Sequence, residues 1–226
     1  MEMNLNERKV NSQIKHRTRV TDHGEVFTHE REVNAMLDLV KQETERLDSR
    51  FLEPACGNGN FLAEVLNRKL KILKDRYSKS QYDYERYSVV VISSIYGIDI
   101  LEDNVEECRE RLLRIFTEEY KKIFKNNINE KFLEVLKILF EKNIVCGDAL
   151  TMKDKKGSPL VFSEWSMPYD DSRLKQKEYS FKDIFTPSIN WTLDRIYTTD
   201  KETGERVILP NVLKDYPLIN FMELKK

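Results

Sequence analysis

The residues most suggestive of chemistry form one short stretch, FLEPACGNGNFL, at positions 51–62. An apolar pair leads into Glu53, and Gly57 and Gly59 precede a second apolar pair. The chain has only 7 glycines in 226 residues, so two of them here indicate a backbone requirement. Glycine permits a sharp turn and lets a ligand approach the N–H groups that open a helix. The stretch predicts a ligand-binding loop between a strand and a helix, with a tight structural turn as the alternative.

Two further acids follow predicted strands. Asp99 ends the strand in YGIDI, and Asp148 follows the strand in NIVCGDAL. The carboxyl ends of parallel strands share one edge, and an acid after the second strand of such a fold accepts hydrogen bonds from ribose hydroxyls. The glycine pattern G-x-G-x-x-G of nicotinamide enzymes is incomplete, because Leu62 stands at its third position. The alternatives are an ordinary loop acid for Asp99 and a helix-capping aspartate for Asp148.

Strands and helices alternate through the first 165 residues. Apolar residues at helical spacing predict helices over 30–47, 61–73, 103–126 and 130–142, and a helix over 79–94 with a strand at 88–92 as the alternative. Short apolar runs predict strands at 50–53, 96–100 and 159–165, and a strand followed by a loop at 143–150. This alternation predicts an α/β fold with a doubly wound, mostly parallel sheet.

The two ends of the chain differ from this middle part. Residues 1–20 are polar and basic, and we interpret them as an arm that meets a phosphate backbone or a partner subunit, or as a mobile tail. Past residue 165 the sequence predicts a helical turn in SFKDIF, a hairpin around Gly204 and apolar last residues that dock on the rest. We therefore divide the chain into the arm (1–20), an α/β domain (21–165) and a C-terminal extension (166–226).

The composition excludes several classes of protein. The net charge of −1 is unlike that of a uniformly basic nucleic-acid binder, and 40% hydrophobic with 34% charged residues is ordinary for a globular domain. No apolar run approaches the roughly 20 residues that span a bilayer, and the N-terminus lacks a secretory pattern. The cysteines and histidines show no metal-ligand spacing, so we expect no metal, reduced thiols and a cytoplasmic location; they are Cys56, Cys108, Cys146, His16, His23 and His29.

The glycine stretch resembles the first motif of S-adenosylmethionine-dependent DNA amino-methyltransferases, in particular the adenine-N6 type, whose pattern is an acid and then P-A-C-G-x-G-x-F-L. HGEVFTHEREVNAMLDLV (23–40) is similar to the G-E-x-F-T-P motif and helix that precede it in modification subunits of restriction systems. GIDI and CGDAL stand where the second and third motifs belong. The resemblance covers about residues 17–165. It implies a Rossmann-like class I methyltransferase fold, the cofactor S-adenosyl-L-methionine, and double-stranded DNA with an adenine target.

The resemblance also implies which residues hold the cofactor. Glu53 would meet the ammonium of its methionine part, and Asp99 would accept the ribose hydroxyls. Ile100 would pack on the adenine ring, and Asp148 would accept from the adenine amino group. The full cofactor-binding set is Phe27, Thr28, Glu53, Ala55, Gly57, Gly59, Asp99, Ile100, Asp148 and Ala149.

The chain departs from the family pattern in two motifs, and the second departure bears on catalysis. His29 replaces a loop-shaping proline, which carries no chemistry. The motif that holds and stacks on a flipped base, N-P-P-Y, is replaced by SMPY at 166–169. By resemblance, Ser166, Pro168 and Tyr169 would form the catalytic set: Ser166 and the carbonyl near Met167 would hold the amine, and Tyr169 would stack on the base. The alternatives are a loop without catalytic meaning and a loss of catalysis.

The length of the C-terminal extension gives a second shortfall. The family places three further strands and a target-recognition region after the catalytic motif, so the resemblance implies an incomplete sheet and a partner subunit or homodimer. An inactive methyltransferase-like subunit or remnant, which binds cofactor or partner only, is the rival hypothesis. A nicotinamide-dependent oxidoreductase is a third, opposed by Leu62 and by the fit of CGDAL.

Two surface interpretations remain open. Trp165, Trp191 and Tyr169 are candidates for base stacking, or for packing in a core or interface. Six basic residues on one predicted helix could follow a phosphate backbone, or could form a solvated face; they are Arg68, Lys69, Lys71, Lys74, Arg76 and Lys79.

Overall fold

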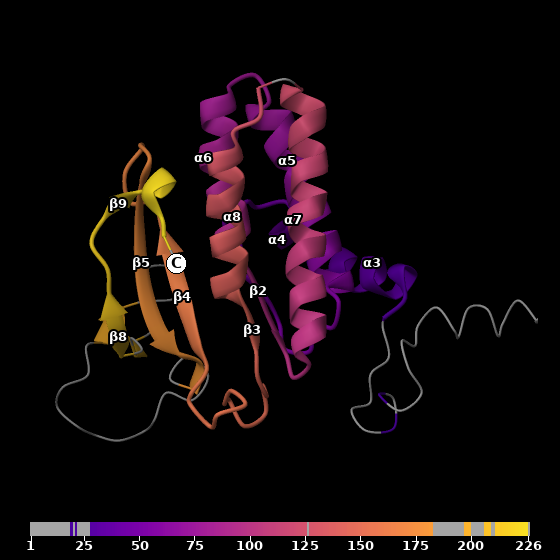
Figure 1. Ribbon diagram of the computed structural model, residues 1–226, viewed down its shortest axis with the longest axis vertical. Coiled ribbons are helices and arrows are strands. Elements are labelled where there is room, and N and C mark those ends of the chain that lie inside the picture. Colours follow the sequence, from indigo (N-terminus) through magenta and orange to yellow (C-terminus); the bar gives the residue numbers. More distant parts are fainter. Residues whose placement is uncertain are drawn as a thin grey trace, which may run out of the picture.

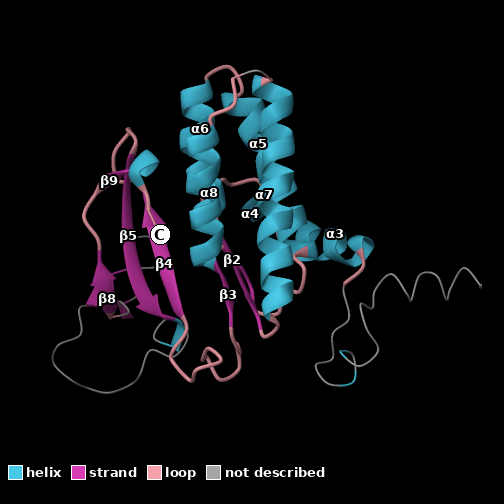
Figure 2. Cartoon of the chain, viewed as in Figure 1, coloured by secondary structure: helices cyan, strands magenta, loops and turns pink. Residues whose placement is uncertain are grey.

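The computed structural model describes residues 28–125, 127–182, 197–199, 206–208 and 211–225, together with Arg19 and Thr21. Within these residues a small parallel sheet carries a group of long helices, and an antiparallel sheet lies beside the helices (Figure 1). Figure 2 shows the same arrangement by element type. Most of the N-terminal arm, Phe27, Trp191 and Gly204 lie outside the described residues.

The parallel sheet has the order β1-β2-β3 and confirms the first three predicted strands. Its strands are β1 (Phe51–Glu53), β2 (Ile95–Asp99) and β3 (Ile144–Cys146). Leu52 pairs with Tyr96, and Ile98 pairs with Val145. Because all three strands run the same way, their carboxyl ends lie at one edge of the sheet, which we call the rim.

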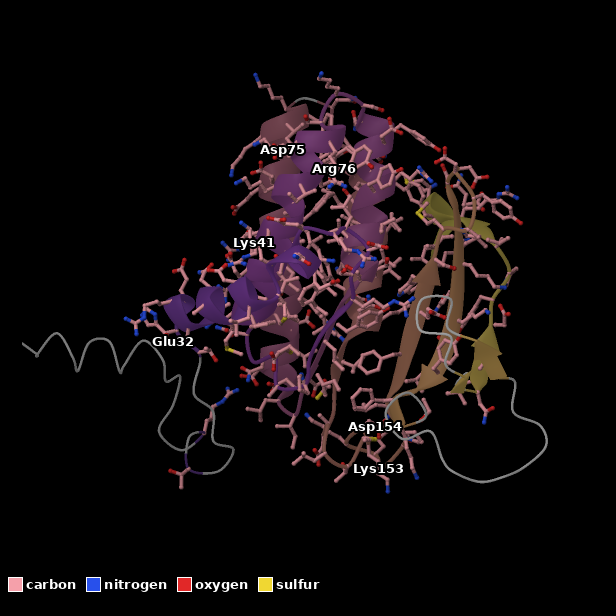
Figure 3. The ribbon with its side chains drawn as sticks, turned by 180° about the vertical axis from the view of Figure 1, so that it is seen from behind. Glu32, Lys41, Asp75, Arg76, Lys153 and Asp154 are labelled. Carbon is pink, nitrogen blue, oxygen red and sulfur yellow. The ribbon has the colours of Figure 1, made fainter. Side chains whose placement is uncertain are left out.

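Each connection between these strands is a pair of helices. The helices α5 (Asn60–Tyr77) and α7 (Glu102–Phe124) lead away from the rim, and α6 (Gln81–Ser93) and α8 (Glu130–Asn143) return to the next strand. The helix predicted over 79–94 is therefore confirmed, and its strand alternative is wrong. Two short helices, α3 (Glu30–Leu39) and α4 (Lys41–Thr44), precede β1. Figure 3 shows Asp75 and Arg76, near the end of α5, opposite to Lys153 and Asp154, which follow β3.

The four long helices pack side by side around an aromatic core. Tyr84, Phe116, Tyr120 and Phe132 are fully buried, and the Tyr84 and Tyr120 rings lie 6.1 Å apart. The buried Phe221 of the 3-10 helix η1 (Phe221–Glu223) reaches this core, with its ring 6.2 Å from that of Phe132. The prediction that the apolar last residues dock on the rest of the chain is thus confirmed.

The C-terminal part forms antiparallel strands. They are β4 (Val161–Ser166), β5 (Arg173–Ser180), β8 (Val212–Asp215) and β9 (Ile219–Asn220), with β6 (Tyr197–Thr199) and β7 (Arg206–Ile208) as a separate pair. The β6–β7 pair confirms the hairpin predicted around Gly204. The fourth strand, by contrast, was predicted in the parallel sheet, and this is wrong: β4 pairs antiparallel with β5. The connection between them is a short turn, which can join antiparallel strands but not parallel ones.

The strand β4 packs against one face of the parallel sheet. The Phe162 ring lies 5.6 Å from that of Tyr96, and the Tyr96 hydroxyl donates to the Ser163 carbonyl at 2.9 Å. The opposite face carries α5, because a side chain added at Gly97 would meet Leu62 at 3.0 Å. Among the described residues, helices therefore cover one face and a strand begins to cover the other, so the doubly wound arrangement is not formed there.

Candidate functional site

The loop between β1 and α5 has the backbone that its glycines predicted. Gly57 and Gly59 have positive φ values of 52° and 85°. A side chain at Gly59 would also come within 2.7 Å of the Cys108 sulfur in α7, so its conformation and its packing both require glycine. The Cys56 amide donates to the Ile98 carbonyl at 2.8 Å, which fastens the loop to the end of β2.

The carboxylate of Asp99 lies directly beneath this loop. Its Oδ2 accepts from the Gly57 amide at 2.9 Å, and its Oδ1 accepts from the Leu101 amide at 2.9 Å and the Asn104 side chain at 3.3 Å. A carboxylate has about four acceptor positions. Asp99 is thus fixed by three protein donors and keeps capacity for a hydroxyl donor.

The ends of β1 and β3 carry the other two predicted acids. Glu53 accepts from the Ala55 amide at 3.2 Å, and burial raises the pKa of its carboxyl. Asp148 is partly exposed; the Leu150 amide and the Thr151 hydroxyl donate to it at 2.8 and 2.9 Å and lower its pKa. Three acids therefore follow the three parallel strands along the rim.

Apolar side chains accompany these acids. Ile100, the residue after Asp99, is 47% exposed, and Leu150 is 93% exposed. Ala149 packs against the buried cluster around Ile98. The rim therefore offers carboxylates and apolar surface together, as a ligand with a sugar and a flat ring would require.

Further side chains that the sequence reasoning missed hold the glycine loop in place. The Asn60 side chain donates to the Thr28 carbonyl at 3.2 Å, which holds Thr28 beside the loop. The Asn58 side chain donates to Glu107 of α7 at 3.2 Å, and Arg111 of α7 donates to Asn60. The two asparagines in G-N-G-N were a usable signal, because short amides beside glycines often bond to neighbouring backbone or side chains.

A second group that the sequence reasoning missed lies in the first turn of α7. Arg19 makes an ion pair with Asp103 at 2.5 Å and donates to the Asn104 side-chain oxygen at 3.0 Å. Asn104 is only 1% exposed, and its nitrogen donates to Asp99. The Asn104 side chain therefore bridges the Arg19 guanidinium and the Asp99 carboxylate.

The structure does not bring Ser166, Pro168 and Tyr169 to the rim. Ser166 helps to line a cavity of about 290 Å³ with Arg50 and Ser94, which precede β1 and β2. The Tyr169 carbonyl accepts from Arg86, in the middle of α6, at 3.2 Å. These residues lie at the opposite end of the parallel strands because β4 begins beside the loop that follows β3, where the Leu160 amide donates to the Met152 carbonyl, and runs away from the rim.

The basic face predicted on α5 is not a simple solvated surface. Lys69 is fully buried, and its ammonium donates to the Leu47 carbonyl, the Ser49 carbonyl and the Ser94 hydroxyl at 3.1, 2.5 and 2.8 Å. Arg68 is paired with Asp38 at 2.9 Å and with Glu64 at 3.0 Å. Neither side chain is therefore available to a phosphate backbone.

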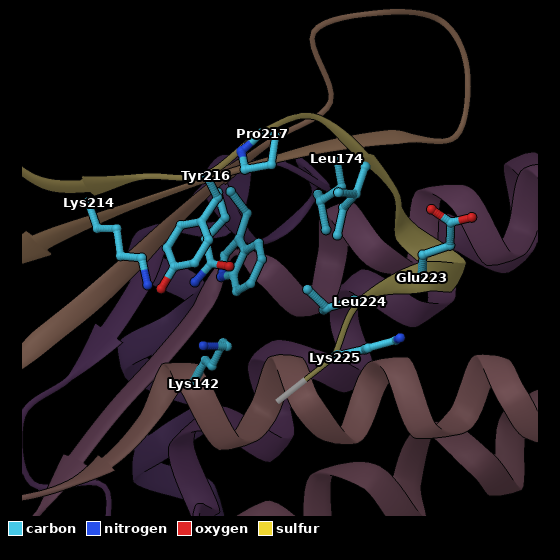
Figure 4. Close-up of a pocket in the computed structure, with 11 residues that line it drawn as sticks. Lys142, Leu174, Lys214, Tyr216, Pro217, Glu223, Leu224 and Lys225 are labelled. Carbon is cyan, nitrogen blue, oxygen red and sulfur yellow. The ribbon is translucent and has the colours of Figure 1, made fainter.

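Another concavity lies between α8 and the C-terminal strands (Figure 4). Its volume is about 300 Å³, and Lys142, Lys214 and Lys225 are among its lining residues. Trp165 is only 6% exposed and donates to Asn143 at 2.8 Å, so it packs rather than stacks on a ligand. Glu178 lies 3.9 Å from Lys142 and accepts from Tyr216, so the charges near this pocket are partly balanced.

Two features are absent from the described ranges: a group of metal ligands and a membrane-spanning helix. No three His, Cys, Asp or Glu side chains there gather as metal ligands. No helix in the same ranges is both long and apolar enough to cross a membrane.

A parallel sheet with left-handed glycines in its first loop and acids at the carboxyl ends of its strands is an arrangement typical of α/β proteins with a ligand site at that edge. Residues 27–164 match the family model described as the MmeI DNA-methyltransferase domain. The match covers more than half of the chain, and the chain belongs to this family.

Two curated relatives support the same assignment. The chain is 27% identical over 139 residues to DNA methyltransferase A of Bacillus subtilis, covering 58% of this chain and 16% of the relative. It is 27% identical over 133 residues to a putative type II restriction enzyme and methyltransferase of Methanocaldococcus jannaschii, covering 56% of this chain and 11% of the relative. The chain thus spans less than a fifth of either relative. No solved structure matches it significantly.

Proposed function

We propose that the chain binds S-adenosyl-L-methionine at the rim and forms the cofactor-binding part of an adenine-N6 DNA methyltransferase of a restriction-modification system. The observation that carries the proposal is the convergence of Glu53, Asp99 and Asp148 with the glycine loop at one edge of the sheet. Membership of the methyltransferase family supports it.

The rim residues fit this cofactor. The carboxyl of Glu53 has its pKa raised by burial, and an ammonium beside it would stabilise the ionised form. Asp99 retains acceptor capacity for a ribose hydroxyl beside its three protein donors. Ile100 offers an exposed apolar surface for a ring, and Asp148 offers a carboxylate for its amino group. Thr28, Ala55, Gly57, Gly59 and Ala149 complete the part of the predicted set that the structure describes; Phe27 lies outside it.

When bound, this cofactor supplies a methyl group activated by a sulfonium. The residues of the chain position the donor, and an exocyclic amine aligned with the S–C bond can then receive the methyl with little further assistance. The adenine amine is our proposed acceptor. It follows from the resemblance of the glycine motif to the adenine-N6 enzymes.

The group that holds the adenine is a separate part of the proposal. Ser166, Pro168 and Tyr169 could serve only if the carboxyl end of β4 lay at the rim, and β4 instead starts beside the rim and runs away from it. We therefore propose that another segment or a partner chain completes the catalytic site beside β1, which is an edge strand of the parallel sheet among the described residues. On this basis the isolated chain should bind cofactor and transfer little methyl to DNA.

Calorimetric titration with S-adenosylmethionine, with NADH as the control ligand, tests cofactor binding. We expect micromolar binding of the former alone. Asp99→Asn should weaken it by about 10- to 100-fold, because hydrogen bonds to a charged group contribute about 1.5–3 kcal/mol. The control is Asp154→Asn, another loop acid, which accepts from the Lys156 and Ser158 amides away from the glycine loop. A folded chain that does not bind would refute the proposal.

A methyl-transfer assay tests the catalytic part. We expect transfer to adenine-containing duplex DNA only when a completing partner is added, and Ser166→Ala and Tyr169→Phe should leave cofactor binding unchanged. Efficient transfer by the isolated chain that is lost in Tyr169→Phe would instead place the 166–169 stretch at the rim in the active state.

A further inference from the structure

The contacts of Arg19 show what the end of the basic arm does. Its guanidinium bonds to both oxygens of Asp103, at 2.5 and 3.3 Å, and to the side-chain oxygen of Asn104 at 3.0 Å. The Arg19 side chain is 18% exposed, whereas that of Asp103 is 57% exposed. Arg19 therefore lies against the beginning of α7 and not in open solvent.

The buried Asn104 transmits this contact to the rim. An asparagine amide has one acceptor end and one donor end, whereas a guanidinium can only donate. Arg19 therefore takes the oxygen of Asn104 and leaves the nitrogen to donate to Asp99 at 3.3 Å. The reversed amide would place its oxygen against the Asp99 carboxylate, which is unfavourable because both groups only accept.

The beginning of α7 is also rich in negative charge. Glu102 and Asp103 occupy its first turn, and Glu107 follows one turn later. Glu102 is paired with Lys155 at 3.1 Å, and Arg19 supplies the positive charge beside Asp103. Without Arg19, the Asp99 carboxylate would lie in a more negative surrounding, and the Asn104 oxygen would lose its bond to the guanidinium.

We propose that Arg19 is a positioning residue for the cofactor: it fastens the N-terminal arm to the rim and orients Asn104 so that Asp99 is held for the ribose hydroxyls. This inference rests on the proposed function. It assigns the end of the arm to the cofactor site rather than to a DNA backbone. Because coupling between two binding events is reciprocal, cofactor binding should also tighten the docking of the arm.

A double-mutant cycle tests whether Arg19 acts on the cofactor site through Asn104. We expect Arg19→Ala to weaken S-adenosylhomocysteine binding by about 10-fold, the size expected for a charge-assisted hydrogen bond. Asn104→Ala should have a similar effect, and Arg19→Ala should add little to it. The matched control is Arg31→Ala, because the Arg31 side chain is 88% exposed and forms an ion pair with its neighbour Glu32. Thermal unfolding of each variant without ligand checks that the fold is retained.

A ribose-modified ligand separates positioning from a general effect. The loss of affinity caused by Arg19→Ala should disappear for the 2′,3′-dideoxyribose analogue of S-adenosylhomocysteine. This analogue lacks the hydroxyls that would donate to Asp99. Unchanged affinity of Arg19→Ala, additive effects in the cycle, or an equal penalty with the dideoxy analogue would each overturn the inference. If the unaltered chain binds neither ligand, the proposed function itself fails.

Discussion

The parallel-sheet region, which carries the glycine loop, and the C-terminal antiparallel region are held in the molecule in different ways. In the former, polar side chains bond to main-chain groups of distant elements, as Asp99 does to Gly57 and Lys69 does to Leu47 and Ser49. In the latter, buried rings such as Phe162 and Phe221 pack on the rest of the molecule, beside polar bonds such as that of Trp165 to Asn143.

This difference indicates which region of the molecule requires a fixed geometry. A hydrogen bond loses its strength over a few tenths of an ångström or at a poor angle, whereas apolar contact is non-directional. The parallel-sheet region is therefore built for fixed geometry, and the C-terminal region for coverage. We expect substitutions in the first region to cost more, and four stability comparisons and one pH profile test that ranking.

The largest expected effect is that of Lys69→Met. The change leaves the Leu47 carbonyl, the Ser49 carbonyl and the Ser94 hydroxyl without their shared buried donor. We expect a loss of about 3–4 kcal/mol in the free energy of unfolding, measured by urea denaturation, because each unsatisfied buried group costs about 1–3 kcal/mol. Lys71→Met, on the exposed side of the same helix, is the control and should change it by less than about 0.5 kcal/mol.

The pH dependence of stability tests the same lysine. Burial lowers the pKa of Lys69 from 10.5 to about 7. Between these two values the unfolded chain binds more protons at this site than the folded chain does, so the free energy of unfolding should rise with pH across that window. Urea titrations from pH 7 to pH 10 should show the rise in the unaltered protein and lose it in Lys69→Met. Identical profiles would mean that the ammonium keeps its charge within the fold.

Gly59→Ala should cost about 2–3 kcal/mol by the same measurement. The new methyl group would occupy a left-handed backbone position and would lie 2.7 Å from the Cys108 sulfur. Gly157→Ala is the matched control, because Gly157 has a φ of +83° but no neighbour within 4 Å. We expect about 1–2 kcal/mol for the control, and the difference between the two variants measures the packing term. Equal costs would show that α7 moves to make room.

Trp165→Phe tests the attachment of the C-terminal region. It removes the bond from the indole nitrogen to Asn143, which is 2.8 Å long and buried. We expect a loss of about 1–2 kcal/mol in the unfolding free energy, since one acceptor is left unsatisfied. Tyr169→Phe, at a 48% exposed ring on the same hairpin, should be close to neutral. A loss larger than that of Lys69→Met would reverse the proposed ranking.

The smallest expected effect is at the ion pair between Arg50 and Glu164. The two groups are 2.7 Å apart, and their side chains are 57% and 34% exposed. A double-mutant cycle with Arg50→Ala and Glu164→Ala should give a coupling below about 1 kcal/mol, decreasing with salt. A larger coupling that resists salt would show that this polar contact, and not apolar packing, fixes β4 on the sheet.

Much of the fold could be predicted because the signals were local. The glycine loop, the four long helices and the position of Asp99 after its strand follow from residue spacing alone. The partner of β4 could not be predicted in this way, since an apolar run looks the same in a parallel and an antiparallel sheet. The direction of pairing is decided by β5, the strand that begins after Ser172 and pairs antiparallel with β4.

Side-chain partners were harder to predict because they come from distant segments. Lys69 takes acceptors from residues that precede β1, and Asn104 takes its donor from the arm. One signal for Lys69 was present: it lies three residues after Leu66 and four before Leu73, on the buried side of α5. A lysine within an apolar stripe predicts a buried ammonium.

The paired helices between the strands also have a consequence for the order of folding. The α5–α6 and α7–α8 pairs contact each other across short turns, whereas Phe51 of β1 must find Ile95 of β2 across both helices of a pair. Local contacts form before distant ones because they close shorter loops. We therefore expect the helices to assemble first and the strand ends last. The cofactor would then bind only to chains whose folding is complete.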